Sequence, residues 1–169
     1  RSPERSNVDK KASGTFQREF DRPESRRVAE RPMITRAVTV HSLPMKGVEY
    51  LKYIKDGVKL FEGRINGPAV KKMKIGDQLK LTDHRAQMGI TCEITSKDVF
   101  YAFEEMLRAK GSLNMLPQLR DRAHVLSLDA LIQEGAKIYR QFPGSNRVST
   151  QGCVAIGVKF LNEFSERRR

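Results

Sequence analysis

The sequence has no tryptophan and contains two cysteines and three histidines among 169 residues. Cys92 and Cys153 stand far apart in apolar stretches, without the short Cys-x-x-Cys spacing of a zinc site or a nearby histidine cluster. We expect both to be buried free thiols in an intracellular, reducing compartment. The sequence therefore predicts no metal site, and no pattern in it indicates a cofactor.

Long apolar runs are also missing. No stretch approaches the roughly 20 apolar residues that a membrane-spanning helix needs. The first thirty residues are charged throughout, which is not the pattern of a secretory signal. We therefore expect no membrane partner, and a location in the mitochondrion or the cytoplasm.

Acidic residues are few relative to basic ones. The chain has 20 Asp and Glu against 32 Lys and Arg, which gives a formal net charge of +12. Such a balance favours a polyanionic partner, because Lys and Arg release the counterions that are condensed on phosphates. Nucleic acid is the leading candidate, and a basic but inert surface is the alternative.

Both ends of the chain are charged extensions. Residues 1–34 carry nine Lys and Arg residues, interleaved with acidic residues and with too few apolar side chains for a core face. This composition predicts a basic, extended arm that threads along RNA or a partner protein. The alternatives are a linker or the remnant of a presequence, and the acidic residues of the segment argue against a presequence. Residues 163–169 form a short basic tail, so residues 35–162 are the predicted domain.

Strand and helix patterns alternate within residues 35–162. Val and polar residues alternate over 36–43, and helical spacing over 48–54 ends at Gly57, a natural C-terminal cap. Ser127 is a plausible N-cap for a later helix. The remaining predicted elements are a hairpin of strands at 78–83 and 89–100, a helix near 103–107, a helix over 129–141 and a last apolar strand over 152–161.

The stretch 57–64 reads Gly-Val-Lys-Leu-Phe-Glu-Gly-Arg and concentrates charge at the end of a helix and the start of a strand. In an extended segment Glu62 and Arg64 would point to one face together with Leu60, and Phe61 would take the opposite, buried face. The direction of Lys59 at the bend cannot be derived from spacing. A solvated strand with a salt bridge is the simplest interpretation.

The same stretch matches the G-x-K-x-x-E-x-R signature of ASCH domains, a branch of the PUA-like superfamily. Later segments resemble ASCH domains in the same order: Gly76-Asp77 before a strand, 103–107 followed by 114–117, and 134–139 leading to 152–158. The resemblance covers about residues 35–162. It implies an α+β fold, a PUA-like β-barrel with flanking helices, here with a basic N-terminal extension.

ASCH and PUA-like domains are mostly associated with RNA, and the resemblance implies a cleft between helices and barrel. Arg64 could bind a phosphate or base edge bidentately, Lys59 could act as a point charge on phosphate, and Glu62 could orient Arg64 or accept from an exocyclic amine. A basic cluster follows in the sequence and flanks this cleft. The predicted RNA- or ligand-binding residues are Lys59, Glu62, Arg64, Lys71, Lys72 and Lys74.

The alternative is an enzyme, because some small bacterial ASCH proteins are amidohydrolases that remove the acyl group of N4-acetylcytidine with a lysine, a threonine and a glutamate. Lys59 matches the lysine, but Glu62 stands where the threonine nucleophile is expected, and the region of the glutamate aligns near Lys110 without a counterpart. A carboxylate can activate water, so Lys59 and Glu62 would be the catalytic residues. The missing nucleophile disfavours this alternative.

The predicted function is therefore that of an RNA-associated ASCH module without catalytic activity. We expect it to be a subunit of a ribonucleoprotein such as a mitochondrial ribosome, bound to ribosomal or other structured RNA. The basic composition and the charged extensions at both ends fit this expectation. The arm would contact other proteins of the particle.

Overall fold

The computed structural model describes residues 36–166, and the predicted arm at 1–34 lies outside them. The strands are β1 (Val40–Pro44), β2 (Phe61–Ile65), β3 (Gln78–Asp83), β4 (Met88–Phe100) and β5 (Cys153–Ser165). The helices are α1 (Val48–Lys55), α2 (Pro68–Lys71), α3 (Phe103–Lys110), α4 (Ser112–Met115), α5 (Arg120–Ala123), α6 (Leu128–Arg140) and α7 (Val148–Gln151). The 3-10 turns Pro117–Leu119 and Ser145–Arg147 complete the described elements.

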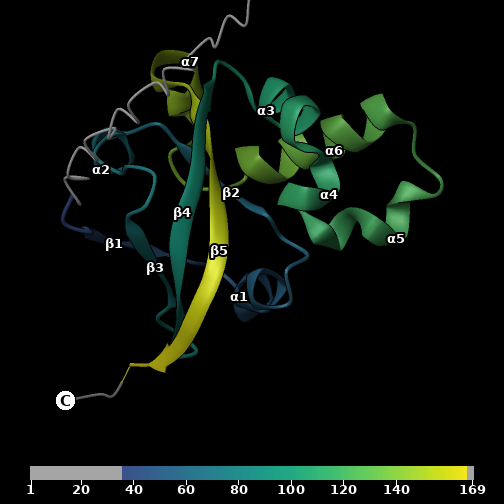
Figure 1. Ribbon diagram of the computed structural model, residues 1–169. Helices are drawn as coiled ribbons and strands as arrows, with labels where there is room; N and C mark the ends of the chain where they lie inside the picture. Colours follow the sequence, from purple (N-terminus) through teal and green to yellow (C-terminus); the bar gives the residue numbers. More distant parts are fainter. Residues whose placement is uncertain (1–35, 167–169) are drawn as a thin grey trace, which may run out of the picture. The chain divides into compact units, whose positions relative to one another are not determined.

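The five strands form one mixed sheet in the order β1-β3-β4-β5-β2. The β1–β3 pair is parallel and the other pairs are antiparallel. The long strands β4 and β5 run side by side through the middle of the domain (Figure 1). The predicted α+β class is confirmed, whereas the predicted barrel is only approximate, because within the described residues β1 and β2 are left as the two edges of an open sheet.

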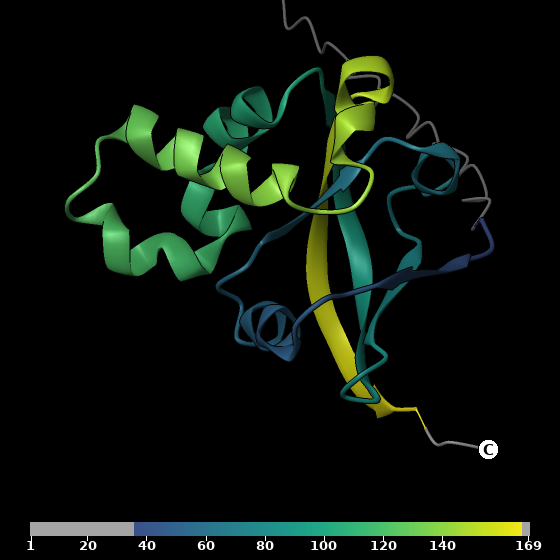
Figure 2. The same ribbon diagram turned by 180° about the vertical axis from the view of Figure 1, so that it is seen from behind.

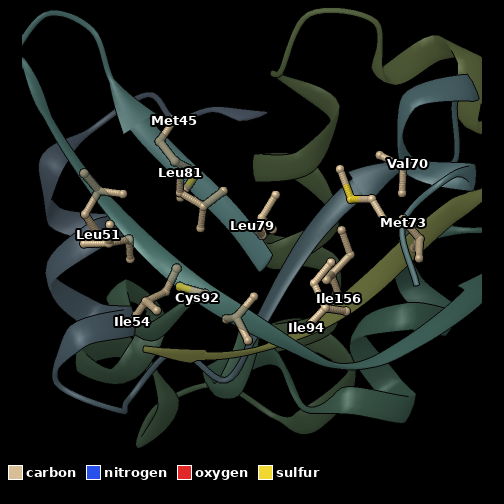
Figure 3. Packing of buried hydrophobic residues seen from close by; sticks show 13 residues of the cluster. Met45, Leu51, Ile54, Val70, Met73, Leu79, Leu81, Cys92, Ile94 and Ile156 are labelled. Atoms are coloured by element: carbon tan, nitrogen blue, oxygen red, sulfur yellow. The ribbon is translucent and has the colours of Figure 1, made fainter. Parts of the chain in front are cut away.

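The first six residues of strand β5, from Cys153 to Val158, are buried on both faces, which explains the continuous apolar run at its start. Its alternate residues Val154, Ile156 and Val158 join a buried cluster with β3, β4 and helices α1 and α2. Figure 3 shows side chains of this cluster, including Ile156, gathered against one another. Cys153 and Ala155 point the other way, into a second cluster built with α3, α4 and α6. The predicted last strand is confirmed, but β5 continues to Ser165 and so includes residues that we had predicted to belong to the C-terminal tail.

Helices α3 to α6 lie together on one side of β5, as Figure 2 shows in green beside the yellow strand. Helix α6 begins where the sequence predicts, since the Ser127 side chain accepts a hydrogen bond from the backbone N–H of Ala130 at 3.2 Å. Its inner face, which includes Ile132, Ala136 and Tyr139, is buried. Within the described residues no helix is long and apolar enough to cross a membrane.

Both cysteines are free thiols in the core, as the sequence predicts. Cys92 belongs to the first cluster and Cys153 to the second. Burial raises the pKa of each thiol to about 12, because the thiolate would lose its hydration in this apolar surrounding. Neither side chain is therefore poised for reaction.

The buried carboxylate of Asp77 attaches β1 to the turn before β3. It contacts His41 Nε2 at 2.9 Å and accepts hydrogen bonds from Arg36 Nη2 at 2.7 Å and from the backbone N–H groups of Lys74 at 3.0 Å and Thr39 at 3.2 Å. The hydrogen bond with His41, assisted by those from Arg36 and the backbone, holds the pKa of Asp77 well below its usual range. His41 is thus part of a structural network.

Candidate functional site

A pocket of about 420 Å³ opens between the end of β1, strand β2, the start of α2 and the helices α3 and α6. Its size falls in the range of roughly 300–1,000 Å³ that is common for small-molecule sites. Its wall is largely apolar and aromatic, with contributions from Phe103, Leu116 and Phe142. The three signature residues Lys59, Glu62 and Arg64 all line it, so the structure brings half of the predicted site residues together.

Lys59 is buried at the floor of this pocket, with 3% of its surface exposed. Its Nζ donates hydrogen bonds to the carbonyl oxygens of Phe61, at 2.8 Å, and Met115, and lies 3.3 Å from Glu62 Oε2. Burial lowers the pKa of Lys59, and the charge of Glu62 opposes this shift. The three N–H donors of the ammonium already face three acceptors, so Lys59 is not free to bind a phosphate, contrary to the expectation from the sequence. Instead it joins β2 to α4.

Glu62 and Arg64 point to the same face, as the alternation in the sequence predicts. Arg64 Nε lies 2.8 Å from Glu62 Oε1, and Arg64 Nη2 donates to the carbonyl oxygen of Pro44 at 2.7 Å. Since Pro44 ends one edge strand and Arg64 lies on the other, this side chain bridges the two edges of the open sheet. Leu60, expected on the same face, precedes β2 and is 43% exposed.

The other predicted residues, Lys71, Lys72 and Lys74, are exposed and do not line the pocket. They lie at the end of α2 and in the connection to β3. Lys97 Nζ fixes the course of this connection by donating to the carbonyl oxygens of residues 70, 71 and 73 at 2.7, 3.1 and 3.0 Å. We call Lys71, Lys72 and Lys74 the basic ledge, and a nucleic-acid contact there stays a prediction.

Two cations at the rim of the pocket were missed by the sequence analysis. Lys46, just after β1, and Arg147, in the turn before α7, line the pocket with exposed side chains. Neither forms an ion pair within residues 36–166, whereas exposed cations of the helical layer such as Arg108 and Arg140 pair with Asp129 and Glu104. No local pattern marks Lys46 or Arg147, because only the fold brings these two segments together.

Two tyrosines of the pocket were also missed. Tyr50 accepts a hydrogen bond at its hydroxyl from Gln118 Nε2 at 2.7 Å. Tyr139 stacks on Phe103 with ring centroids 5.3 Å apart and an interplanar angle of 15°. Burial is the main cause that raises the pKa of both phenols. Gly63 makes room for Tyr139, since a Cβ atom at residue 63 would lie 2.5 Å from the phenolic oxygen.

Comparisons with known proteins support the fold. A scan against protein-family models and a search of curated proteins find no match. Among solved structures, the hypothetical protein PH0355 is 29% identical, with a TM-score of 0.59 over 73% of this chain and 100% of that one. Protein PF0455 from Pyrococcus furiosus is 26% identical, with a TM-score of 0.55 over 73% of this chain and 99% of that one. An ASCH protein from Zymomonas mobilis is 16% identical, with a TM-score of 0.44 over 75% of this chain and 71% of that one. The chain has the fold of PH0355 and PF0455.

The pocket offers few groups for the amidohydrolase alternative. Lys110, where a glutamate was expected, does not line the pocket and pairs with Asp98 at 2.6 Å. Among the lining residues Ser145 alone has a hydroxyl or thiol of the Ser, Thr or Cys type, and its Oγ donates to the carbonyl oxygen of Arg140 at 2.8 Å. In the part of the chain that the structure describes, no three His, Cys, Asp or Glu side chains cluster in a way that could hold a metal ion.

Proposed function

We propose that this ASCH-like domain is an RNA-binding module that inserts one unstacked base of an RNA chain into its pocket. The observation that carries the proposal is the composition of the pocket, an aromatic wall above a charged floor. RNA is read in sequence-specific complexes mainly through unstacked bases, which stack on aromatic rings and form hydrogen bonds along their edges. The net charge of +12 supports a polyanionic ligand.

Each polar group of the floor has a defined part in this proposal. Lys59 holds the floor together through Phe61, Met115 and Glu62. Both oxygens of Glu62 keep free lone pairs, because a carboxylate accepts about four hydrogen bonds, so Glu62 accepts from an exocyclic or ring N–H of the base. Arg64 uses Nε and Nη2 for its protein contacts, which leaves Nη1 to donate to the base or sugar.

Phe142 allows a direct test, since it lines the pocket and is only partly buried. Stacking of one base on an aromatic ring contributes about 1–3 kcal/mol, so Phe142→Ala should weaken the binding of single-stranded RNA roughly 5- to 150-fold. Fluorescence anisotropy with a labelled RNA of mixed sequence measures this loss. The matched control is Phe164→Ala, which removes a partly buried ring of β5 outside the pocket. Equal loss in both variants, or unchanged affinity in Phe142→Ala, would refute base insertion.

We further infer that the module acts without catalysis, as a subunit of a ribonucleoprotein such as a mitochondrial ribosome, on ribosomal or another structured RNA. The charged composition of residues 1–34 supports a place in a larger particle. Sedimentation of the native protein from mitochondrial and cytoplasmic fractions, with and without ribonuclease, tests this proposal. Co-migration with a heavy particle that ribonuclease disrupts is the expected result, and migration as a small protein in all samples contradicts it.

The second candidate is an amidohydrolase acting on a nucleoside such as N4-acetylcytidine. It is favoured by the contact of Lys59 with Glu62 inside the pocket. In that reaction Glu62 would take a proton from water, and the hydroxide would attack the acetyl carbonyl. Glu62 would then pass the proton to N4 as the C–N bond breaks, which releases acetate and cytidine. Release of acetate from N4-acetylcytidine that stops in Glu62→Gln would establish the enzyme, and no release excludes this substrate.

A further inference from the structure

The charges that line the pocket are strongly unbalanced. The lining residues include four cations, Lys46, Lys59, Arg64 and Arg147, and one anion, Glu62, so that four minus one leaves an excess of three positive charges. Glu62 is already in contact with Lys59 and Arg64. The excess therefore lies mainly with Arg64 and the rim residues, and a neutral ligand would leave it uncompensated.

The positions of these cations divide the pocket into two zones. Lys59 is buried among backbone carbonyls and serves the floor. Lys46 and Arg147 come from segments about a hundred residues apart in sequence, yet both border the same opening with exposed side chains. Among the contacts within residues 36–166, Arg147 makes one weak hydrogen bond, from Nε to the carbonyl oxygen of Gly144 at 3.3 Å, so the end of its guanidinium is available to a ligand.

We propose that Lys46 and Arg147 form a phosphate clamp at the rim, so that the pocket selects a phosphorylated nucleotide over the corresponding neutral nucleoside. The inference rests on the proposed RNA-binding function and adds the class of ligand. A base between the aromatic side chains would leave its phosphate at the opening, where a guanidinium and an ammonium provide a bidentate donor and a point charge. The phosphate is either a terminal group of a mononucleotide or a diester of an RNA chain.

The electrostatic effect of the clamp is moderate because both side chains are exposed. One cation at about 4 Å from the phosphate in a water-like medium contributes roughly a factor of five in affinity. Two cations, reduced by the screening of salt, contribute about tenfold together. We therefore expect a nucleotide to bind about tenfold more tightly than its nucleoside at low salt, with a difference that shrinks as salt is added.

Calorimetric titration tests the clamp with the four ribonucleosides and their 3′- and 5′-monophosphates, at low and high salt. At least one monophosphate should bind about tenfold more tightly than its nucleoside to the wild-type protein, a preference that the double variant Lys46→Gln/Arg147→Gln should lose. The matched control, Arg120→Gln/Lys159→Gln, removes two exposed charges outside the pocket and outside the basic ledge, and should retain the preference.

Labelled single-stranded RNA separates the two sources of phosphate. If the clamp holds a diester, Lys46→Gln/Arg147→Gln weakens RNA binding. If it holds a terminal phosphate, removal of the terminal phosphate from the RNA weakens binding to the wild-type protein. Equal binding of nucleosides and monophosphates, no binding of any monophosphate, or an equal loss in the control variant would overturn the clamp. RNA binding that depends on Phe142 would survive each of these results, so the clamp and the proposed function fail separately.

Discussion

Replacement of Lys59 by methionine tests whether the signature lysine is a structural residue or a ligand contact. Its Nζ joins β2 to α4 through the carbonyl oxygens of Phe61 and Met115 and faces the carboxylate of Glu62. Methionine keeps the length and apolar contacts of the stem but removes all three N–H donors. The variant therefore isolates the contribution of the buried ammonium.

The expected loss of stability depends on the buried groups that lose their partner when the ammonium is removed. Removal of one partner of a buried ion pair destabilises proteins by about 3–5 kcal/mol, and two carbonyl oxygens also lose a charged donor. Glu62 keeps Arg64 Nε at 2.8 Å as a counter-charge, and the desolvation cost of the ammonium disappears. We expect Lys59→Met to lower the free energy of unfolding by about 3 kcal/mol, at the low end of that range.

The pH dependence supplies an independent check. Burial lowers the pKa of Lys59 in the folded protein, so between that lowered value and the unfolded value of about 10.4 the unfolded chain binds more protons. Stability of the wild type then rises with pH in this window, and the rise is absent in Lys59→Met. Urea denaturation at several pH values between about 7 and 9.5 gives the free energy of unfolding of both proteins, and the difference between them should widen as the pH rises. This range lies below that in which tyrosines ionise. A loss under about 0.5 kcal/mol, in the range of surface substitutions, would refute the structural role, and a difference that is constant with pH would contradict the lowered pKa of Lys59.

Two further substitutions test the surroundings of the site. Asp77→Asn should destabilise the protein at pH 7 and make its stability depend less on pH under acidic conditions. The pKa of Asp77 is lowered mainly by His41, so this carboxyl contributes stability above about pH 4 that is lost as the pH falls towards the lowered value. Equal urea midpoints of both proteins at pH 7 would contradict this. Gly63→Ala should cost about 1–3 kcal/mol by overpacking, since its Cβ would lie 2.5–2.7 Å from atoms of Tyr139. Thermal unfolding should show partial recovery when Tyr139→Leu is added, and a fully additive loss would mean that the two residues do not collide.

Much of the fold could be predicted from local patterns. The apolar run of β5 and the spacing and Ser127 cap of α6 depend on neighbours in sequence, and both elements appear where they were expected. The shared face of Glu62 and Arg64 follows from strand alternation alone. The open sheet could not be predicted in this way, because closure of a barrel depends on pairing between β1 and β2, which are distant in sequence.

Only half of the residues that the sequence predicts for the site line the pocket, again because the fold brings together segments that are distant in sequence. Lys71, Lys72 and Lys74 were selected because they are neighbours in the chain, but the turn of α2 directs the segment so that Pro68–Val70 line the pocket instead. The rim cations belong to separate segments that carry no pattern of their own. Lys59 was assigned to phosphate by its charge, whereas its burial, which spacing could not reveal, directs its donors to backbone carbonyls.

The open sheet and the pocket have a common origin. A backbone pairing of β1 with β2 would close the opening between these two edges, and the hydrogen bond from Arg64 Nη2 to Pro44 spans it with a single side chain. The backbone of β2 that faces the pocket is then free to carry Glu62 and Gly63, with Tyr139 filling the space above the glycine. The stretch from Lys59 to Arg64 thus combines three tasks within six residues: Lys59 anchors β2 to the helices, Glu62 provides a buried acceptor, and Arg64 holds the edges at a distance that leaves room for a ligand.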